Sequence, residues 1–132
     1  MSKPIHEITI GTMEKKTNQV NTLFDTGSFY TIVREDVLPE TKFVYWYPVP
    51  DEFKTAVKGG KLQIKGVTRL TIEYNNRKIV EGDILISSDI NREMIIGAKT
   101  MQAWDIVINN KNGKTTVTFG KDMRDPEITE VD

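Results

Sequence analysis

One carboxylate in this 132-residue chain follows what reads as the end of a buried strand. Asp25 comes after residues 21–24 (Asn-Thr-Leu-Phe) and before Thr26 and Gly27. A buried, ionised carboxylate is destabilising unless it is paired, so such a group usually has a partner, a bound metal or a shifted pKa. Gly27 permits a tight turn and close backbone approach, so Asp25 can be presented into a confined space. The alternative is an ordinary strand-ending turn, in which Asp, Gly and Ser are common.

A second element lies near residue 95. Ile95-Ile96-Gly97 ends a strand-like run, and the short segment after it has helical spacing. Together with the Asp25 motif, this element resembles the aspartic proteases, and most closely their single-domain, retropepsin-like branch. Residues 24–28 are similar to the catalytic loop of that family, and residues 58–61 (Lys-Gly-Gly-Lys) are similar to its flap tip. The order and separation of these elements agree with the family over residues 5–108.

The strand pattern and the resemblance point to the same architecture. Apolar and polar residues alternate at 62–65 and 70–74, and Asn75-Asn76 and Asn112-Gly113 are typical of hairpin turns. We expect an all-β fold of the acid-protease type: a closed barrel with a flap hairpin and one short helix at about 98–103, one lobe per chain, active as a homodimer.

The chain length suits a single domain. We assign residues 1–119 to the retropepsin-like domain and residues 120–132 to a polar, acidic C-terminal tail. Residues 41–52 hold several aromatic residues and two prolines, and we expect them to be irregular. Packing is a commoner role for such aromatic clusters than substrate recognition, which is the alternative.

Only one Asp-Thr-Gly occurs in the sequence, and Asp-Ser-Gly does not occur. Aspartic protease chemistry needs two carboxylates around one water, so one chain supplies half of the site. A C2 homodimer would place Asp25 of each subunit on the symmetry axis. The resemblance therefore implies an active site that exists only in the dimer.

The resemblance also implies roles for the residues of the motif. The two Asp25 carboxylates would share a proton and titrate as a coupled pair, as aspartic proteases are known to do. One would take a proton from the attacking water, and the other would stabilise the oxyanion and protonate the leaving nitrogen. Thr26 would hydrogen-bond across the dimer axis, and Gly27 would admit the substrate backbone. Ser28 would donate a hydrogen bond to the neighbouring carboxylate and lower its pKa.

Three further residues are implied to bind substrate. Gly59 and Gly60 would form a mobile flap tip that closes over an extended peptide, and Ile95 would line an apolar pocket. Outside the family, a glycine pair is an ordinary hairpin turn and an isoleucine in a strand is ordinarily core. The resemblance implies no metal and no organic cofactor.

Two positions depart from the retroviral pattern. Retroviral enzymes typically carry an acid two positions after the loop glycine and an arginine just after the later glycine, and the two side chains pair. Here these positions are Phe29 and Ala98. Losing both partners leaves no uncompensated charge, so the catalytic loop is not in question, but the strength and strand arrangement of the dimer are.

Composition limits the partners. The 18 basic and 19 acidic side chains form no basic cluster, which argues against nucleic acid. Cysteine is absent, and no apolar run reaches membrane-spanning length. The N-terminus lacks the apolar core of a signal peptide, so we expect a cytoplasmic protein that binds a second copy of itself and a polypeptide substrate, but no membrane.

We therefore expect a homodimeric aspartic endopeptidase that hydrolyses peptide bonds in extended polypeptide segments. The alternative is a catalytically silent domain of the same fold that binds peptides or only dimerises. A third possibility is a β-barrel without protease activity in which the motif occurs by chance. The intact Asp25-Thr26-Gly27 favours the first hypothesis.

Overall fold

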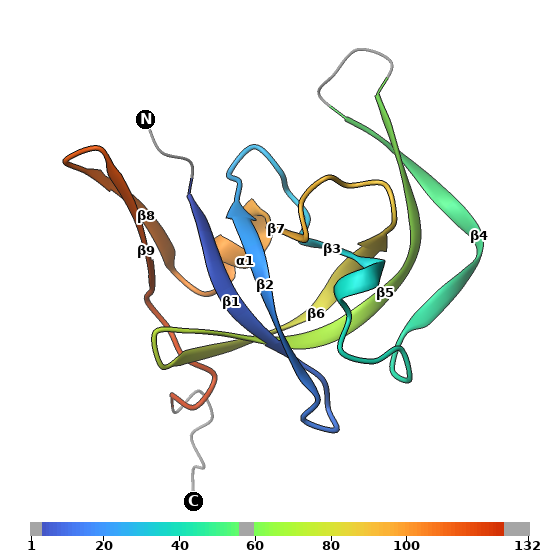
Figure 1. Ribbon diagram of the computed structural model, residues 1–132, viewed down its shortest axis with the longest axis horizontal. Helices are drawn as coiled ribbons and strands as arrows, with labels where there is room; N and C mark the ends of the chain where they lie inside the picture. Colours follow the sequence, from blue (N-terminus) through green and yellow to red (C-terminus); the bar gives the residue numbers. More distant parts are fainter. Residues whose placement is uncertain (1–3, 56–59, 126–132) are drawn as a thin grey trace, which may run out of the picture.

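The computed structural model describes residues 4–55 and 60–125 (Figure 1). Within these ranges, strands joined by turns and loops make up most of the structure, with one short helix, α1 (Ala98–Ala103), and one 3-10 turn, η1 (Glu35–Val37). No helix in the described part is long and apolar enough to cross a membrane. The strands are β1 (Ile5–Gly11), β2 (Thr17–Phe24), β3 (Ile32–Arg34), β4 (Tyr45–Lys54), β5 (Lys61–Tyr74), β6 (Arg77–Ser87), β7 (Met94–Ile96), β8 (Ile106–Lys111) and β9 (Lys114–Phe119).

Among the described residues, six strands close into a barrel in the order β1-β2-β7-β3-β6-β5, because β5 also pairs with β1. The pairs β2–β7 and β3–β6 are parallel, and the others are antiparallel. β4 pairs with β5 outside this ring, and β8 and β9 form a separate two-stranded sheet. The expected closed barrel with one short helix is confirmed.

The hairpin turns follow from local backbone preferences. Asn75 and Asn76 both have positive φ, at 50° and 62°, and Asn112 and Gly113 have φ of 53° and 75°. Two successive residues with positive φ give the twist that matches a two-residue β-hairpin, and Asn and Gly adopt this backbone most readily. Both expected turns are therefore confirmed, and they fix the registers of β5–β6 and β8–β9.

Two apolar clusters stabilise the fold. The larger fills the barrel with side chains of β1, β2, β5, β6 and β7. The smaller lies between the barrel wall and the β4–β5 hairpin, with Tyr47 and Phe53 of β4 packed against it. Each fully buried large apolar side chain contributes about 1.5–3 kcal/mol, so the smaller cluster attaches the hairpin by only a few such contributions. Its buried members are Ile32, Leu62, Ile64 and Leu85.

β4 corrects one expectation. Residues 41–52 are not irregular throughout, because a strand begins at Tyr45 and pairs with β5. The register shifts between Trp46 and Asp51, and Pro48 and Pro50 lie within this shift. Proline is tolerated there because an edge strand with a bulge does not need every N–H donor.

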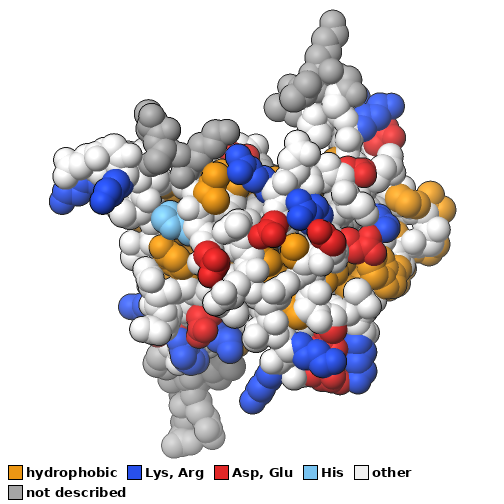
Figure 2. Space-filling view, viewed as in Figure 1, with side chains coloured by type: hydrophobic (Ala, Val, Ile, Leu, Met, Phe, Trp, Pro, Cys, Tyr) orange, Lys and Arg blue, Asp and Glu red, His pale blue; other side chains and the backbone are white. Residues whose placement is uncertain are grey.

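Some apolar side chains of β4 are packed against the barrel, and others are exposed to solvent. Tyr47 packs against the smaller cluster, as the packing interpretation requires. Tyr45 is 60% exposed and Val49 is 75% exposed. Figure 2 shows hydrophobic side chains gathered over β4 at the right of the molecule. Packing therefore accounts for only part of this stretch.

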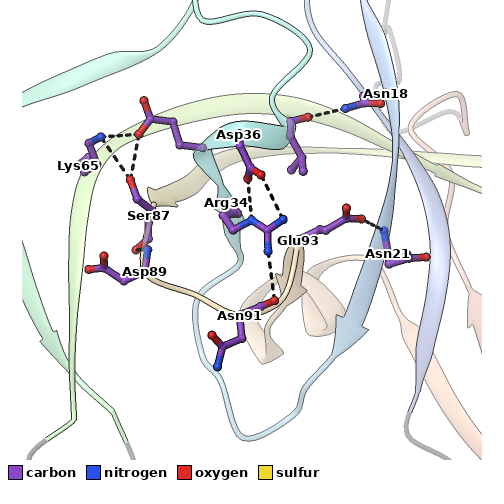
Figure 3. A network of polar contacts seen from close by, with 12 residues as sticks. Asn18, Asn21, Arg34, Asp36, Lys65, Ser87, Asp89, Asn91 and Glu93 are labelled. Carbon is purple, nitrogen blue, oxygen red and sulfur yellow. Dashed lines mark hydrogen bonds and ion pairs between the residues drawn. The ribbon is translucent and has the colours of Figure 1, made fainter.

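A polar network joins the β4–β5 hairpin to the barrel (Figure 3). Lys65 of β5 pairs with Glu35 of η1, and the Ser88 hydroxyl donates to the same carboxylate at 3.0 Å. Next to it, the Arg34 guanidinium donates to Asp36 at 2.6 Å. The hydrogen bond from Lys65 lowers the pKa of Glu35, and that from Arg34 lowers the pKa of Asp36. These contacts favour the ionised carboxylates and hold η1 against the base of the hairpin.

The start of the acidic C-terminal segment is held against the barrel. Asp122 is 5% exposed and accepts hydrogen bonds from the Lys78 backbone N–H at 2.7 Å and from Arg124 Nη2 at 2.6 Å. The Met123 N–H donates to the Lys78 carbonyl at 2.6 Å, so both backbone groups of Lys78 in β6 bind the segment. The Arg124 guanidinium, with the backbone N–H donors, holds the pKa of Asp122 well below its usual range.

We expect Asp122→Asn to lower the melting temperature near neutral pH, because the amide is a weaker partner for Arg124. Since the folded-state pKa of Asp122 is depressed, its stabilisation is fully present above the unfolded pKa of about 3.9 and is lost as pH falls through the folded pKa. Melting curves between pH 3 and 7 should therefore show a constant deficit above about pH 5 that shrinks in acid. The exposed Asp51→Asn serves as the control. A deficit that did not change with pH would contradict this role.

Candidate active site

The Asp25 motif and the Ile95-Ile96-Gly97 element meet at one end of the barrel. β2 runs parallel to β7, with Leu23 opposite Ile95 and Phe24 opposite Ile96. Asp25 is the first residue after β2, and its N–H donates to the Ile96 carbonyl at 2.9 Å. Because the two strands are parallel, their carboxyl ends lie together. This pairing brings the two sequence elements, far apart in the chain, into contact.

Phe24 fixes the base of the motif. Its side chain is 1% exposed, and its ring contacts the edge of Phe119 with ring centroids 6.2 Å apart. Asp25, the next residue, is half-buried, whereas Thr26 and Gly27 are exposed. Strand alternation therefore turns Phe24 into the core and leaves the motif at the surface of the single chain.

The loop itself orients the Asp25 carboxylate. The Gly27 N–H donates to Asp25 Oδ1 at 2.9 Å, and the Ser28 N–H donates to the Asp25 carbonyl at 3.1 Å. These bonds are the Asx-type contacts that Asp forms in turns. A backbone donor stabilises the ionised carboxylate and restricts its rotation. The sequence expectation that Asp25 is presented by a tight turn is thus what the geometry shows.

Ser28 corrects one expected contact. Its Oγ donates to the Tyr30 carbonyl at 2.9 Å, not to a carboxylate. A hydroxyl has one proton, and here that proton satisfies a carbonyl of the same loop. The role of Ser28 in this structure is therefore to stabilise the loop.

α1 binds the carbonyl side of the loop. The Ala98 N–H donates to the Ser28 carbonyl at 2.6 Å, and the Lys99 N–H donates to the Phe29 carbonyl at 3.0 Å. The first N–H groups of a helix have no partner within it, so these donors are free for the loop. The contact requires a glycine at position 97, where a Cβ would lie 2.4 Å from the Tyr30 carbonyl oxygen and 2.6 Å from that of Phe29. Gly97 therefore allows the loop and the helix to approach closely.

Positions 29 and 98, where the expected charge pair is missing, lie in this contact. Backbone hydrogen bonds to Ala98 and Lys99 hold the loop there. The Phe29 side chain is 55% exposed and lies edge-on to Tyr30, with ring centroids 5.1 Å apart. Both charged partners are replaced together, so no charge is left without its partner.

The other expected site residues are placed as follows. Ile95 is partly buried in β7 between Leu23 of β2 and Ile32 of β3. The carbonyl of Gly60 accepts from the Thr55 N–H at 3.0 Å at the end of the β4–β5 hairpin, whereas Gly59 lies outside the described residues. In Figure 1 the hairpin and the loop after β2 extend toward the same end of the molecule.

Thr26 adjoins a cleft of about 630 Å³ that is lined by residues of α1 and β8. Asp25 does not line this cleft. A single chain therefore has an exposed motif beside an apolar cleft, rather than a carboxylate enclosed in a pocket of its own.

Sequence reasoning missed two kinds of residue near the loop. Tyr30 contacts Phe53 of β4, with ring centroids 5.4 Å apart, and so links the loop to the hairpin. Thr31 and Thr100 are 2% and 0% exposed, and their hydroxyl oxygens lie 2.6 Å apart. Thr100 could have been singled out as a polar residue on the buried face of a short helix. Its hydrogen-bond partner, Thr31, cannot be identified from the sequence.

Comparison with known proteins supports the fold. The chain is similar to EIAV protease, solved in complex with the inhibitor HBY-793, with a TM-score of 0.56 and 20% identity over 77% of this chain and 88% of that one. It is also similar to the retroviral protease-like domain of Ddi1 from Leishmania major, with a TM-score of 0.64 and 17% identity over 89% of each chain. No protein-family model and no curated protein matches the sequence. The chain has a retropepsin-like fold.

We expect Gly97→Ala to destabilise the protein by about 1–3 kcal/mol, because the added methyl would overlap three carbonyl oxygens. Gly82→Ala is the matched control, since a Cβ there meets nothing within 4 Å, and it should stay within about 0.5 kcal/mol of wild type. Urea unfolding of the three proteins measures both values. Equal stability of the two variants would mean that the loop and α1 do not pack closely.

Proposed function

We propose that this retropepsin-like chain is a homodimeric aspartic endopeptidase that hydrolyses peptide bonds in extended polypeptide segments. The observation that carries the proposal is the placement of an intact Asp25-Thr26-Gly27 at the end of β2. There the Gly27 N–H orients the carboxylate, and Gly97 with α1 holds the loop. A motif that occurred by chance would have no reason to meet this second element.

The presence of a single Asp25 motif in each chain supports a dimer. Each chain supplies one Asp25, and the neighbouring Thr26 is exposed beside the cleft between α1 and β8. A two-fold axis next to Thr26 would bring two such loops together and cover these surfaces. The substrate would then lie between the paired loops and the two β4–β5 hairpins, which would act as flaps.

The chemistry follows from placing two carboxylates close together. Both cannot ionise comfortably, so the pair holds one proton and titrates as a unit. The ionised Asp25 takes a proton from the attacking water. The protonated Asp25 donates a hydrogen bond to the oxyanion, and a proton then reaches the leaving nitrogen. In each subunit, the Gly27 N–H restricts the carboxylate that does this work.

The first test is cleavage of denatured casein between pH 3 and 7 by wild type and Asp25→Asn. We expect the variant to lose about 10²- to 10⁴-fold or more of the activity, because an amide cannot act as the acid or the base. Pepstatin should weaken cleavage by the wild type. Glu73→Gln, an exposed carboxylate of β5, is the control. Absence of cleavage by a folded wild-type dimer would instead favour a silent domain that binds peptides or only dimerises.

Mixing subunits tests whether the site is shared. We expect an excess of Asp25→Asn subunits to reduce the activity per wild-type subunit, because mixed dimers carry only one Asp25. Light scattering should give the mass of a dimer for both proteins. Unchanged activity after subunit exchange, or activity from a monomer, would contradict the shared site. The same amount of an unrelated protein controls for competition between added protein and substrate.

A further inference from the structure

A line of hydrogen bonds runs from the base of the candidate catalytic loop to β6. The Gly97 N–H donates to Thr31 Oγ1 at 3.1 Å, and Thr31 Oγ1 lies 2.6 Å from Thr100 Oγ1. Thr100 Oγ1 then donates to Glu81 Oε1, also at 2.6 Å. The two hydroxyl groups are buried, so these contacts satisfy groups that water does not reach.

The Glu81 carboxylate, at the end of this line, determines which group donates and which accepts in each hydrogen bond. Ionised Glu81 has no proton to give, so Thr100 must donate to it. Thr100 can then only accept from Thr31, whose oxygen remains free to accept from Gly97. If Glu81 were absent, the two hydroxyl groups would hold two protons for the one hydrogen bond between them, so one buried proton would have no acceptor within this line. Loss of Glu81 is thus felt beside the loop, because an unpaired buried hydroxyl is costly.

Glu81 reaches this line from the inner face of β6, next to a bulge. Between the pairs Thr68–Ile84 and Leu70–Glu81, β6 has one residue more than β5. In an antiparallel pair, residues directly opposite each other point to the same face. Leu70 is 1% exposed and faces the core, so Glu81, which lies directly opposite it and two residues after the buried Ile79, points to the same inner face. The Gly82 N–H donates to Glu81 Oε2 at 2.9 Å and fixes the second carboxylate oxygen.

The opposite end of the line supports the Asp25 loop. Gly97 follows Ile96, whose carbonyl accepts from the Asp25 N–H, and precedes the α1 donors to Ser28 and Phe29. Thr31 ends the same loop, and its carbonyl accepts from the Leu85 N–H at 3.0 Å. A shift of Gly97 would therefore move both ends of the loop. A displacement of about 1 Å in a catalytic group can cost about 10²-fold in rate.

We infer that Glu81 is a positioning residue for the Asp25 loop, acting through Thr100 and Thr31 on the Gly97 N–H. This inference rests on the proposed protease function for its effect on rate, but not for its effect on the Gly97 amide. Glu81 does not contact the carboxylate of Asp25 in this arrangement. It holds the geometry that the paired Asp25 side chains would need.

Two matched pairs of variants test the inference. Thr100→Val keeps the shape and removes the hydroxyl, whereas Thr100→Ser keeps the hydroxyl. Glu81→Leu removes the acceptor, whereas Glu81→Gln keeps an oxygen that can accept. kcat and KM are measured with a peptide that the wild type cleaves, and hydrogen exchange of the Gly97 amide is measured by NMR on the same full-length proteins. Glu73→Gln is the control, and melting curves show which variants are folded.

We expect Thr100→Val and Glu81→Leu to lower kcat by about 10- to 100-fold with little change in KM, and to speed exchange of the Gly97 amide. Thr100→Ser and Glu81→Gln should retain most of both properties. Wild-type kcat and exchange in the Val and Leu variants would overturn the inference. So would a loss of activity that only follows the folded fraction. If the wild type cleaves no peptide, the proposed function fails, and the exchange comparison of Val with Ser alone decides the inference.

Discussion

The close contact between Gly97 and the carbonyl groups of residues 28–30 is the constraint on which the candidate site depends. A side chain at position 97 would occupy the space of three carbonyl oxygens. With glycine there, the first N–H groups of α1 reach the loop, and the Asp25 N–H reaches the Ile96 carbonyl. Backbone groups thus do the positioning, and they cannot change rotamer. The Gly27 N–H orients the Asp25 carboxylate, and no charged side chain of the described residues forms an ion pair with it.

The fold consists of a closed barrel and a β4–β5 hairpin that is attached to it by fewer contacts. The closed barrel leaves few free strand edges and buries the larger apolar cluster. The β4–β5 hairpin is attached by the smaller cluster, by the Lys65–Glu35 pair and by the contact of Tyr30 with Phe53. Fewer buried contacts allow a hairpin to move more easily than a barrel wall. The candidate loop therefore belongs to the rigid part of the fold, and the β4–β5 hairpin to the more weakly attached part.

Three structural carboxylates are held in the ionised form by basic side chains. Hydrogen bonds from Arg34, Lys65 and Arg124 lower the pKa values of Asp36, Glu35 and Asp122 respectively. A carboxylate with a depressed folded-state pKa keeps its stabilising contacts until the pH falls through that value.

The local elements could be predicted from the residues alone: the two-residue turns at 75–76 and 112–113, the short helix after Gly97 and the turn that presents Asp25. Each depends on backbone preferences or periodicity within a few residues. Side-chain hydrogen bonds and the contacts between residues far apart in the chain became visible only in the folded structure. They include the hydrogen bond that the Ser28 hydroxyl donates to the Tyr30 carbonyl, the pairing of β4 with β5 despite the prolines of β4, and the hydrogen bond from Thr100 to Glu81. Hydrogen-bond partners and strand faces depend on register, and register is set by the packing of the whole barrel.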